Sequence, residues 1–305
     1  MQATSNIFLV RPSTFAFNTE TAASNAFQNP AQYDVQRKAL NEFDGMVNLL
    51  KAKGINVFVF DDTPFPSKPD AIFPNNWITL HADGTVVLYP MFAPNRRLER
   101  RMDIVNSLRM HFDVKNVIDL SGHEKENRFL EGTGSIVFDH NNKIAYASVS
   151  CRTDKDILIK LSEKLGYEPI VFHAVDKNGQ EIYHTNVVMC IAEKFAVVCL
   201  DAICYEEERA NIINRFASSA HYLINITFEQ MNGFAGNMLQ VKSKVGKNIL
   251  VLSETAFKSL NAEQKNKLAE FVELLPCSIN TIETIGGGSA RCMIAEIFLS
   301  QPPAL

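Results

Sequence analysis

Residues that could carry out chemistry recur at similar points along the chain, in loops beside apolar strands. They are Asp70, Asn75, Asn76, Glu131, His184, Asn186, Asn237 and Cys292. The set includes a thiol that could act as a nucleophile and an imidazole that could transfer protons. Its carboxylates and amides could bind polar groups. The recurrence at matching positions favours a site over a merely structural role.

Each of these residues also has a structural interpretation when it is considered alone. A histidine at the start of a strand is often a buried structural residue, and a cysteine in an apolar strand often fills space in the core. The run 286–289, Gly-Gly-Gly-Ser, lacks the last glycine and the following helix of a dinucleotide-binding loop. Successive glycines let the backbone approach a ligand closely, which would place Cys292 beside that ligand.

The segments that carry these residues form an internal repeat. Each begins with a small or polar loop and continues into one or two apolar strands, joined by turns such as Asp83-Gly84. The five segments span residues 75–90, 131–149, 184–200, 235–252 and 286–299. A repeat of this kind predicts one structural unit used several times.

A helix and a further strand are predicted between successive loops. The helical stretches cover 31–53, 95–111, 154–165, 206–217 and 262–274, and the strands cover 55–60, 114–120, 168–175, 221–227 and 278–284. Pairing the first strand, 6–12, with the last, 292–299, would close a ring and remove open edges. We therefore expect one α/β domain, residues 1–305, of ββαβ units with sheets inside and helices outside.

The composition is that of an ordinary globular protein. Apolar residues make up 46% and charged residues 21% of the 305 residues, which excludes a disordered or collagen-like chain. The net charge of −4 gives no field for a nucleic-acid backbone, and no run of about eighteen apolar residues predicts a membrane span. No signal peptide is visible, and the six cysteines lack zinc-ligand spacing. We therefore expect a cytoplasmic protein that binds neither nucleic acid nor membrane.

The motifs together resemble the pentein superfamily of enzymes that modify guanidino and ureido groups. Residues 286–293 resemble its glycine-rich nucleophile loop, 130–132 its acidic loop, 184–186 its His-x-Asp motif, and 69–76 the Pro-Asp stretch of dimethylarginine hydrolases. The resemblance covers essentially the whole chain and is closest to the citrulline-utilisation hydrolases, with dimethylarginine hydrolases and arginine deiminases as relatives. It implies a five-bladed α/β propeller with pseudo-five-fold symmetry.

Two positions depart from the pattern of the members that process arginine. Those members hold the guanidinium cation with aspartates, whereas this chain has Asn76 and Asn186 at the matching positions. Neutral amides forgo charge-assisted hydrogen bonds to a cation, but they suit a ureido group, which has both an acceptor and donors. The departure favours citrulline over arginine, although succinylarginine dihydrolases also have asparagines nearby and act on a guanidine.

The resemblance implies a mechanism that needs no metal and no organic cofactor. Cys292 as thiolate would attack the ureido or guanidino carbon, His184 would act as general acid and base, and Glu131 would bind the substrate nitrogens. Water would resolve the covalent intermediate. From citrulline the products would be ornithine, ammonia and carbon dioxide.

The amino-acid end of the small-molecule substrate needs partners of opposite charge. The resemblance assigns its carboxylate to Arg152 and Arg97, with Arg96 as the alternative to Arg97, and its amino group to Asp70. It places Asn75, Asn76 and Asn186 in the substrate-binding set as well. Residues 12–30 are interpreted as a lid over the site or as a simple crossover loop.

Three alternatives remain open from the sequence. The chain could be a guanidine hydrolase acting on arginine, methylarginine or succinylarginine, or it could be an amidinotransferase. It could also be a propeller-shaped binding protein without catalytic activity. Whether the chain forms a homo-oligomer is not indicated.

Overall fold

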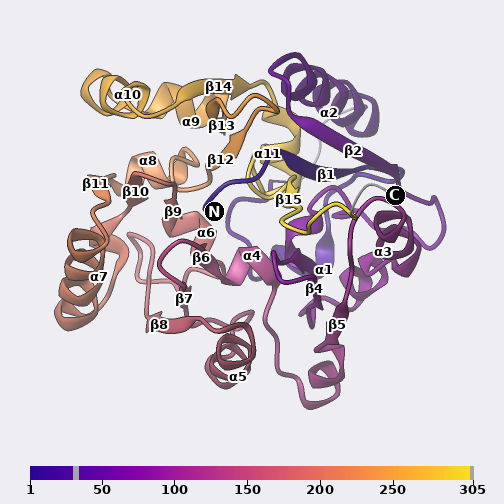
Figure 1. Ribbon diagram of the computed structural model, residues 1–305, viewed down its shortest axis with the longest axis horizontal. Coiled ribbons are helices and arrows are strands. Elements are labelled where there is room, and N and C mark those ends of the chain that lie inside the picture. Colours follow the sequence, from indigo (N-terminus) through magenta and orange to yellow (C-terminus); the bar gives the residue numbers. More distant parts are fainter. Residues whose placement is uncertain (30–33, 303–305) are drawn as a thin grey trace.

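The computed structural model describes residues 1–29 and 34–302, in which five small sheets lie around a common centre with longer helices outside them (Figure 1). The sheets are β3 (Ile78–Leu80), β4 (Thr85–Leu88) and β5 (Asn116–Asp119); β6 (Val137–Asp139), β7 (Ile144–Ser148) and β8 (Glu168–Phe172); β9 (Met189–Ile191), β10 (Phe195–Val198) and β11 (Tyr222–Asn225); β12 (Leu239–Lys242), β13 (Asn248–Ser253) and β14 (Glu273–Cys277); and β15 (Ala295–Glu296), β1 (Asn6–Arg11) and β2 (Asn56–Asp61).

Every sheet is built in the same way. An antiparallel pair is extended by a third strand that runs parallel to the central one. A parallel neighbour needs a crossover connection, and a helix provides it each time. The crossover helices are α2 (Val35–Ala52), α3 (Met102–Arg109), α5 (Lys155–Leu165), α7 (Glu206–Ser218) and α10 (Ala262–Ala269). This order agrees with the repeated unit that the sequence predicts.

The two ends of the chain meet in one sheet. Strand β15 pairs antiparallel with β1, with Ile7 opposite Glu296 and Phe8 opposite Ala295. The backbone N–H of Ile297 adds a 2.9 Å hydrogen bond to the carbonyl oxygen of Asn6. The last unit thus takes its central strand from the start of the chain, as the expected ring closure requires.

Shorter helical segments complete the structure. They are α1 (Thr19–Ala22), α4 (Gly132–Ser135), α6 (Thr185–Val188), α8 (Phe228–Asn232), α9 (Glu254–Ser259), α11 (Asn280–Gly286) and the 3₁₀ turns Pro74–Asn76, Pro94–Glu99, Ser121–Glu126 and Leu200–Ala202. The helix predicted for 95–111 is divided between the turn 94–99 and α3. Of the helix predicted for 31–53, the first residues lie outside the described part.

Two predictions near the C-terminus are wrong. The helix predicted for 262–274 stops at Ala269, and β14 takes over at Glu273 because its residues pair with β13 and Pro276 cannot lie inside a helix. The strand predicted for 278–284 is mainly helix α11. The buried Ile279, Ile282 and Ile285 recur every three residues, which is the period of a helix face.

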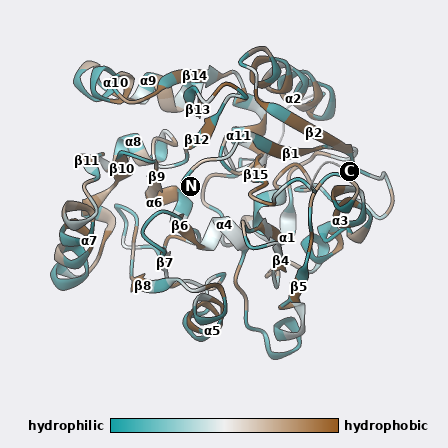
Figure 2. Cartoon of the chain, in the orientation of Figure 1, coloured by the Kyte–Doolittle hydropathy of each residue, from teal (hydrophilic) through white to brown (hydrophobic). Residues whose placement is uncertain are grey.

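Hydrophobic residues fill the strands and the inner faces of the helices (Figure 2). Helix α2 buries a stripe that includes Phe43, Met46 and Leu50 and exposes its opposite side. Trp77 is buried against Phe8, with ring centroids 6.3 Å apart, so it belongs to the core. Among the described residues, no helix is long and apolar enough to cross a membrane.

Candidate active site

A small cavity near the centre of the molecule brings together most of the residues that the sequence singles out. Its lining consists of Asn25, Asp70, Phe73, Asn76, Arg96, Arg152, Tyr183, His184, Gly286, Gly287, Gly288 and Cys292. The volume is about 20 Å³, room for about one water molecule. The sulfur of Cys292 and the imidazole of His184 therefore border the same narrow cavity.

Glu131 and His184 form a hydrogen-bonded pair behind this cavity. Each residue immediately precedes a short helix, Glu131 before α4 and His184 before α6, and those two helices are in contact. The Nε2 of His184 lies 2.8 Å from Oε2 of Glu131, and both side chains are buried, at 3% and 0% exposure. Glu131 also accepts the N–H of Phe92 at 2.9 Å and faces Arg152 Nη1 at 3.4 Å.

Burial and the surrounding charges change the pKa values of Glu131 and His184. Burial alone would raise the pKa of Glu131, but Arg152, His184 and Arg96 together hold that pKa well below its ordinary range. Burial lowers the pKa of His184 to about 4, against the opposing effect of Glu131. At neutral pH the pair is therefore a carboxylate and a neutral imidazole, which is the form that can accept a proton.

Cys292 faces amide groups from two other units. The Nδ2 atoms of Asn237 and Asn186 lie 3.3 and 3.5 Å from its Sγ, and Asn237 Nδ2 also donates to the carbonyl oxygen of Asn186 at 3.0 Å. The thiol is 7% exposed. The sulfur therefore lies between amide groups and the cavity, where a substrate could reach it.

The glycine run fixes the backbone that leads to Cys292. Gly287 ends helix α11 with φ of +67°, a conformation that favours glycine. A Cβ at Gly288 would lie 2.8 Å from the ring of Phe73, closer than real contacts allow. The hydroxyl of Tyr183 donates to the carbonyl oxygen of Gly287 at 3.1 Å. The run therefore packs tightly against the cavity wall.

Asp70 and Arg152 carry opposite charges in the wall. Asp70 Oδ2 accepts from Asn18 at 2.7 Å and from Thr21 at 3.3 Å, while its Oδ1 has no partner among the described residues. Burial raises the pKa of Asp70, although Arg96 opposes this. The guanidinium of Arg152 lies over the ring of Tyr183, 4.8 Å from its centroid.

Of the two neighbouring arginines considered for the substrate carboxylate, Arg96 rather than Arg97 lines the cavity. Arg97 donates to the carbonyl oxygens of Met91 and Phe92 and lies 3.6 Å from Glu124, outside the lining. Consecutive residues of a 3₁₀ turn point in directions about 120° apart, so only one of the two can face inward. The preference for Arg97 is corrected accordingly.

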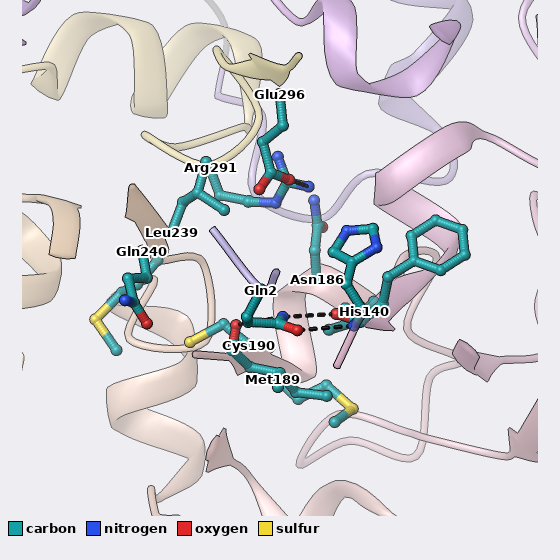
Figure 3. Close-up of a pocket in the computed structure, with 13 residues that line it drawn as sticks. Gln2, His140, Asn186, Met189, Cys190, Leu239, Gln240, Arg291 and Glu296 are labelled. Carbon is teal, nitrogen blue, oxygen red and sulfur yellow. Dashed lines mark hydrogen bonds and ion pairs between the residues drawn. The ribbon is translucent and has the colours of Figure 1, made fainter. Parts of the chain in front are cut away.

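Asn75 and Asn186 do not line this cavity. Asn75 is fully buried, and its carbonyl oxygen accepts from Thr133 at 3.3 Å. Asn186 lies between Cys292 and a second cavity of about 30 Å³, towards which Arg291 and Glu296 also point (Figure 3). Arg291 donates to Glu296 at 3.1 Å, so its charge is paired away from the thiol.

The segment 18–28 covers the cavity. Arg152 Nη2 donates to the Ser24 hydroxyl at 2.6 Å and to the Thr21 carbonyl oxygen at 3.3 Å, and Gln28 donates to the Gly286 carbonyl oxygen at 3.1 Å. These contacts agree with the lid interpretation of residues 12–30, of which residue 30 lies outside the described part.

Several residues of the cavity wall, or in contact with it, were not identified from the sequence. Tyr183 precedes His184 directly, and Asn18, Thr21 and Ser24 lie within the segment considered as a lid, but no pattern marks them individually. Asn237 stood out as a loop residue without a role, and its contact with Cys292 depends on packing between distant units.

Comparison with solved structures shows the same fold in several hydrolases. An apo structure of ArgZ, an arginine dihydrolase from the ornithine–ammonia cycle in cyanobacteria, is 17% identical with a TM-score of 0.77, and the match covers 98% of this chain and 41% of that one. Unliganded AgrE is 18% identical with a TM-score of 0.76 over 96% of this chain and 39% of that one. A dimethylarginine dimethylaminohydrolase adduct with 4-chloro-2-hydroxymethylpyridine is 14% identical with a TM-score of 0.66 over 97% and 100%.

The chain therefore spans about two fifths of the full-length ArgZ and AgrE chains, as the 41% and 39% coverages state. It matches 99% of the separate N-terminal domain of ArgZ, with a TM-score of 0.74. No curated protein sequence matches the chain.

A match of the sequence to a family model identifies the family, whereas the structural matches above show a shared fold. The family described as N,N dimethylarginine dimethylhydrolase, eukaryotic, matches residues 11–299, nearly the whole chain. With the five-sheet architecture and these matches in place, the chain belongs to this dimethylarginine dimethylhydrolase family of the pentein superfamily.

Proposed function

We propose that this chain is a cofactor-free hydrolase that breaks C–N bonds of the ureido group of citrulline through a covalent intermediate on Cys292. The observation that carries the proposal is the cavity in which this thiol and His184 meet, with Glu131 hydrogen-bonded behind the imidazole. Neutral amides next to the sulfur, from Asn186 and Asn237, suit a neutral substrate group better than a cation.

The first half of the reaction forms the covalent intermediate. His184 takes the thiol proton of Cys292, and the thiolate forms a C–S bond with the ureido carbon. The terminal C–N bond then breaks, and the leaving nitrogen takes the proton from His184 and departs as ammonia. Glu131 stabilises the imidazolium that forms in between, because its carboxylate is ionised and hydrogen-bonded to the ring.

The second half returns the enzyme to its starting state. His184 removes a proton from water, the hydroxide forms a C–O bond with the carbonyl carbon, and the C–S bond breaks. The proton returns to the sulfur of Cys292. The released carbamate loses carbon dioxide, which leaves ornithine. Every step uses residues of the chain, the substrate and water.

The charged groups of the wall suit an amino-acid substrate. Arg152 offers positive charge and Asp70 negative charge around one cavity, which matches a zwitterion. We also infer that the five sheets are the blades of an α/β propeller within one domain, since each has the same strand order and the last contains both chain ends.

A guanidine hydrolase is the second candidate. The unpartnered Oδ1 of Asp70 lies on a residue of the wall and could accept an N–H of a cationic substrate. The family match and the arginine dihydrolase named among the structural neighbours also favour this candidate.

An ammonia-release panel tests the proposal. Purified protein is incubated with citrulline, arginine, methylated arginines and succinylarginine, and the Cys292→Ser variant serves as the control. Release from citrulline with formation of ornithine supports the proposal, and mass spectrometry of the quenched protein should find a covalent adduct on Cys292. Release from a guanidine alone selects the second candidate, and release from none of the compounds contradicts hydrolysis of this class.

A further inference from the structure

The guanidinium of Arg96 is held in a fixed direction by a neighbouring carboxylate. Its Nε and Nη2 donate to the two oxygens of Glu99, each at 2.9 Å, and Nη2 also reaches the carbonyl oxygen of Phe73 at 3.3 Å. Both side chains are buried, Arg96 at 3% exposure. A bidentate pair of this kind restricts the rotation of the guanidinium, so the position of its remaining nitrogen, Nη1, is determined.

That remaining nitrogen determines how the amide of Asn76 is oriented. Arg96 Nη1 donates to Asn76 Oδ1 at 3.0 Å. A guanidinium has only donors, so Asn76 must turn its oxygen towards Arg96 and its NH₂ group away from it. The Nδ2 atom is buried and has no partner among the described residues.

The free NH₂ group lies beside the proton-transferring histidine. If Gly134 carried a Cβ atom, that atom would lie 2.3 Å from Asn76 Nδ2 and 2.7 Å from Cε1 of His184. The amide nitrogen and the imidazole are therefore both packed against this glycine. Asn76 and His184 also line the same cavity. The site therefore presents a fixed hydrogen-bond donor, and not an acceptor, next to His184.

We propose that Glu99 and Arg96 are positioning residues that make Asn76 a specificity-determining donor for the carbonyl oxygen of a ureido group. This inference rests on the proposed function and adds the reason for its substrate class. A ureido oxygen accepts the Asn76 N–H, whereas the end of a guanidinium has only N–H groups, which would face another donor. Sites that leave a buried polar group unpaired discriminate strongly against the wrong substrate.

Two variants separate orientation from simple stability. Asn76→Asp keeps the shape of residue 76 but offers an oxygen to the cavity. The double variant Arg96→Met with Glu99→Gln removes the fixed guanidinium together with the carboxylate that pairs with it, while Asp70 loses a 3.8 Å ion pair but keeps its hydrogen bonds from Asn18 and Thr21. The amide of Asn76 then becomes free to rotate. Arg97→Met is the matched control, because this neighbouring arginine lies outside the cavity lining.

The measurement is kcat/KM for citrulline and for arginine in each protein. Wild-type protein should prefer citrulline. Asn76→Asp should lower the citrulline-to-arginine ratio by about tenfold or more, and the double variant should lower it by about fivefold, whereas Arg97→Met should change it by less than about twofold. A purely structural role for these residues would reduce both values together and leave the ratio unchanged.

The outcomes distinguish this inference from the proposed function. Turnover of either amino acid with an unchanged ratio in Asn76→Asp would overturn the orientation argument and leave the hydrolase proposal intact. A wild-type preference for arginine would overturn it as well. Absence of turnover for both amino acids would contradict the proposed function itself. If the double variant does not fold, the result for Asn76→Asp alone tests the inference, because Asn and Asp side chains have nearly the same volume.

Discussion

Cys292 differs from the other buried cysteines in the groups that face its sulfur. Burial raises the pKa of Cys190 to about 12, of Cys199 to about 11 and of Cys277 to about 12, which suits inert thiols in the core. The sulfur of Cys292 instead faces two amide N–H groups and a cavity. These surroundings support the proposal that Cys292, and no other buried cysteine, is the nucleophile.

Replacement of the nucleophile should separate binding from turnover. In Cys292→Ser a hydroxyl takes the place of the thiol, and we expect ammonia release to fall by about a thousandfold or more because the covalent step is lost. Citrulline affinity, measured by calorimetry, should stay within about fivefold because the charged wall is unchanged. Full activity in this variant would remove the nucleophile assignment.

Glu131 should matter through its charge and not only through its shape. Glu131→Gln retains a hydrogen-bonding group near His184 but removes the carboxylate that stabilises the imidazolium, so we expect kcat to fall by about a hundredfold. Glu296→Gln is the matched control, since Glu296 is also paired with an arginine but points to the second cavity. Equal losses of kcat in the two variants would argue against a role of Glu131 in catalysis.

At the scale of elements, we expect the segment 18–28 to move when a substrate binds. The cavity holds about 20 Å³, far less than an amino acid occupies, and Arg152 and Asp70 are engaged by residues of this segment. The contacts that fasten it include side-chain hydrogen bonds, which can break by local opening without unfolding of the whole protein. We therefore propose that this segment controls access to Cys292.

Loosening this segment should expose the thiol. Asn18→Ala removes the 2.7 Å hydrogen bond to Asp70 and the exchange of hydrogen bonds with Asn95. We expect carbamidomethylation of Cys292 by iodoacetamide, followed by mass spectrometry, to become about fivefold faster or more, because an unmade hydrogen bond shifts the opening equilibrium by about 1 kcal/mol. Thr19→Ala, at an exposed position of the same segment, should leave the rate unchanged. Equal rates in all three proteins would contradict the role of the segment as a cover.

The elements that the sequence predicts best are those with local signals. Gly166 ends helix α5 in the left-handed conformation, and the predicted turn Asp83-Gly84 joins β3 to β4. The errors arose where tertiary pairing outweighed the local pattern. The apolar Phe271, Val272 and Leu274 extend a helical pattern, yet the chain passes into β14 at Glu273 because β13 offers a parallel partner.

At the scale of the whole molecule, the repeat explains which parts of the site could be predicted. Glu131 and His184 begin equivalent segments, so a ring of repeated units brings them together without any knowledge of side-chain packing. Contacts between unlike units could not be predicted in this way. The hydrogen bonds from Arg96 to Asn76 and from Asn237 to Cys292 depend on exact side-chain directions, which the repeat does not specify.

Burial at the centre of the molecule also links its stability to pH. Burial lowers the pKa of His81 to about 4 and of His184 to about 4, and it lowers the pKa of His140 well below its ordinary value. In the unfolded chain a histidine binds a proton below about pH 6.5, whereas these histidines stay neutral in the folded protein. Their contribution to the stability of the fold is therefore present above about pH 6.5 and is lost as the pH falls. Buried carboxyls with a raised pKa, such as Glu296, instead favour the folded state as the pH falls. The effect of a single histidine must therefore be measured separately from that of the carboxyls.

His81 is suited to that comparison because it does not line the cavity at Cys292, and its Nε2 lies 2.8 Å from the Thr79 hydroxyl. The free energy of unfolding of wild-type protein minus that of His81→Gln should fall by about 3 kcal/mol between pH 7 and pH 4, since the pKa is lowered from 6.5 to about 4. Urea unfolding followed by the fluorescence of Trp77, the one tryptophan of the chain, measures this difference at each pH. The carboxyl contributions are common to both proteins and cancel in the subtraction. A difference that stays constant across this range would mean that His81 is not held neutral in the folded protein.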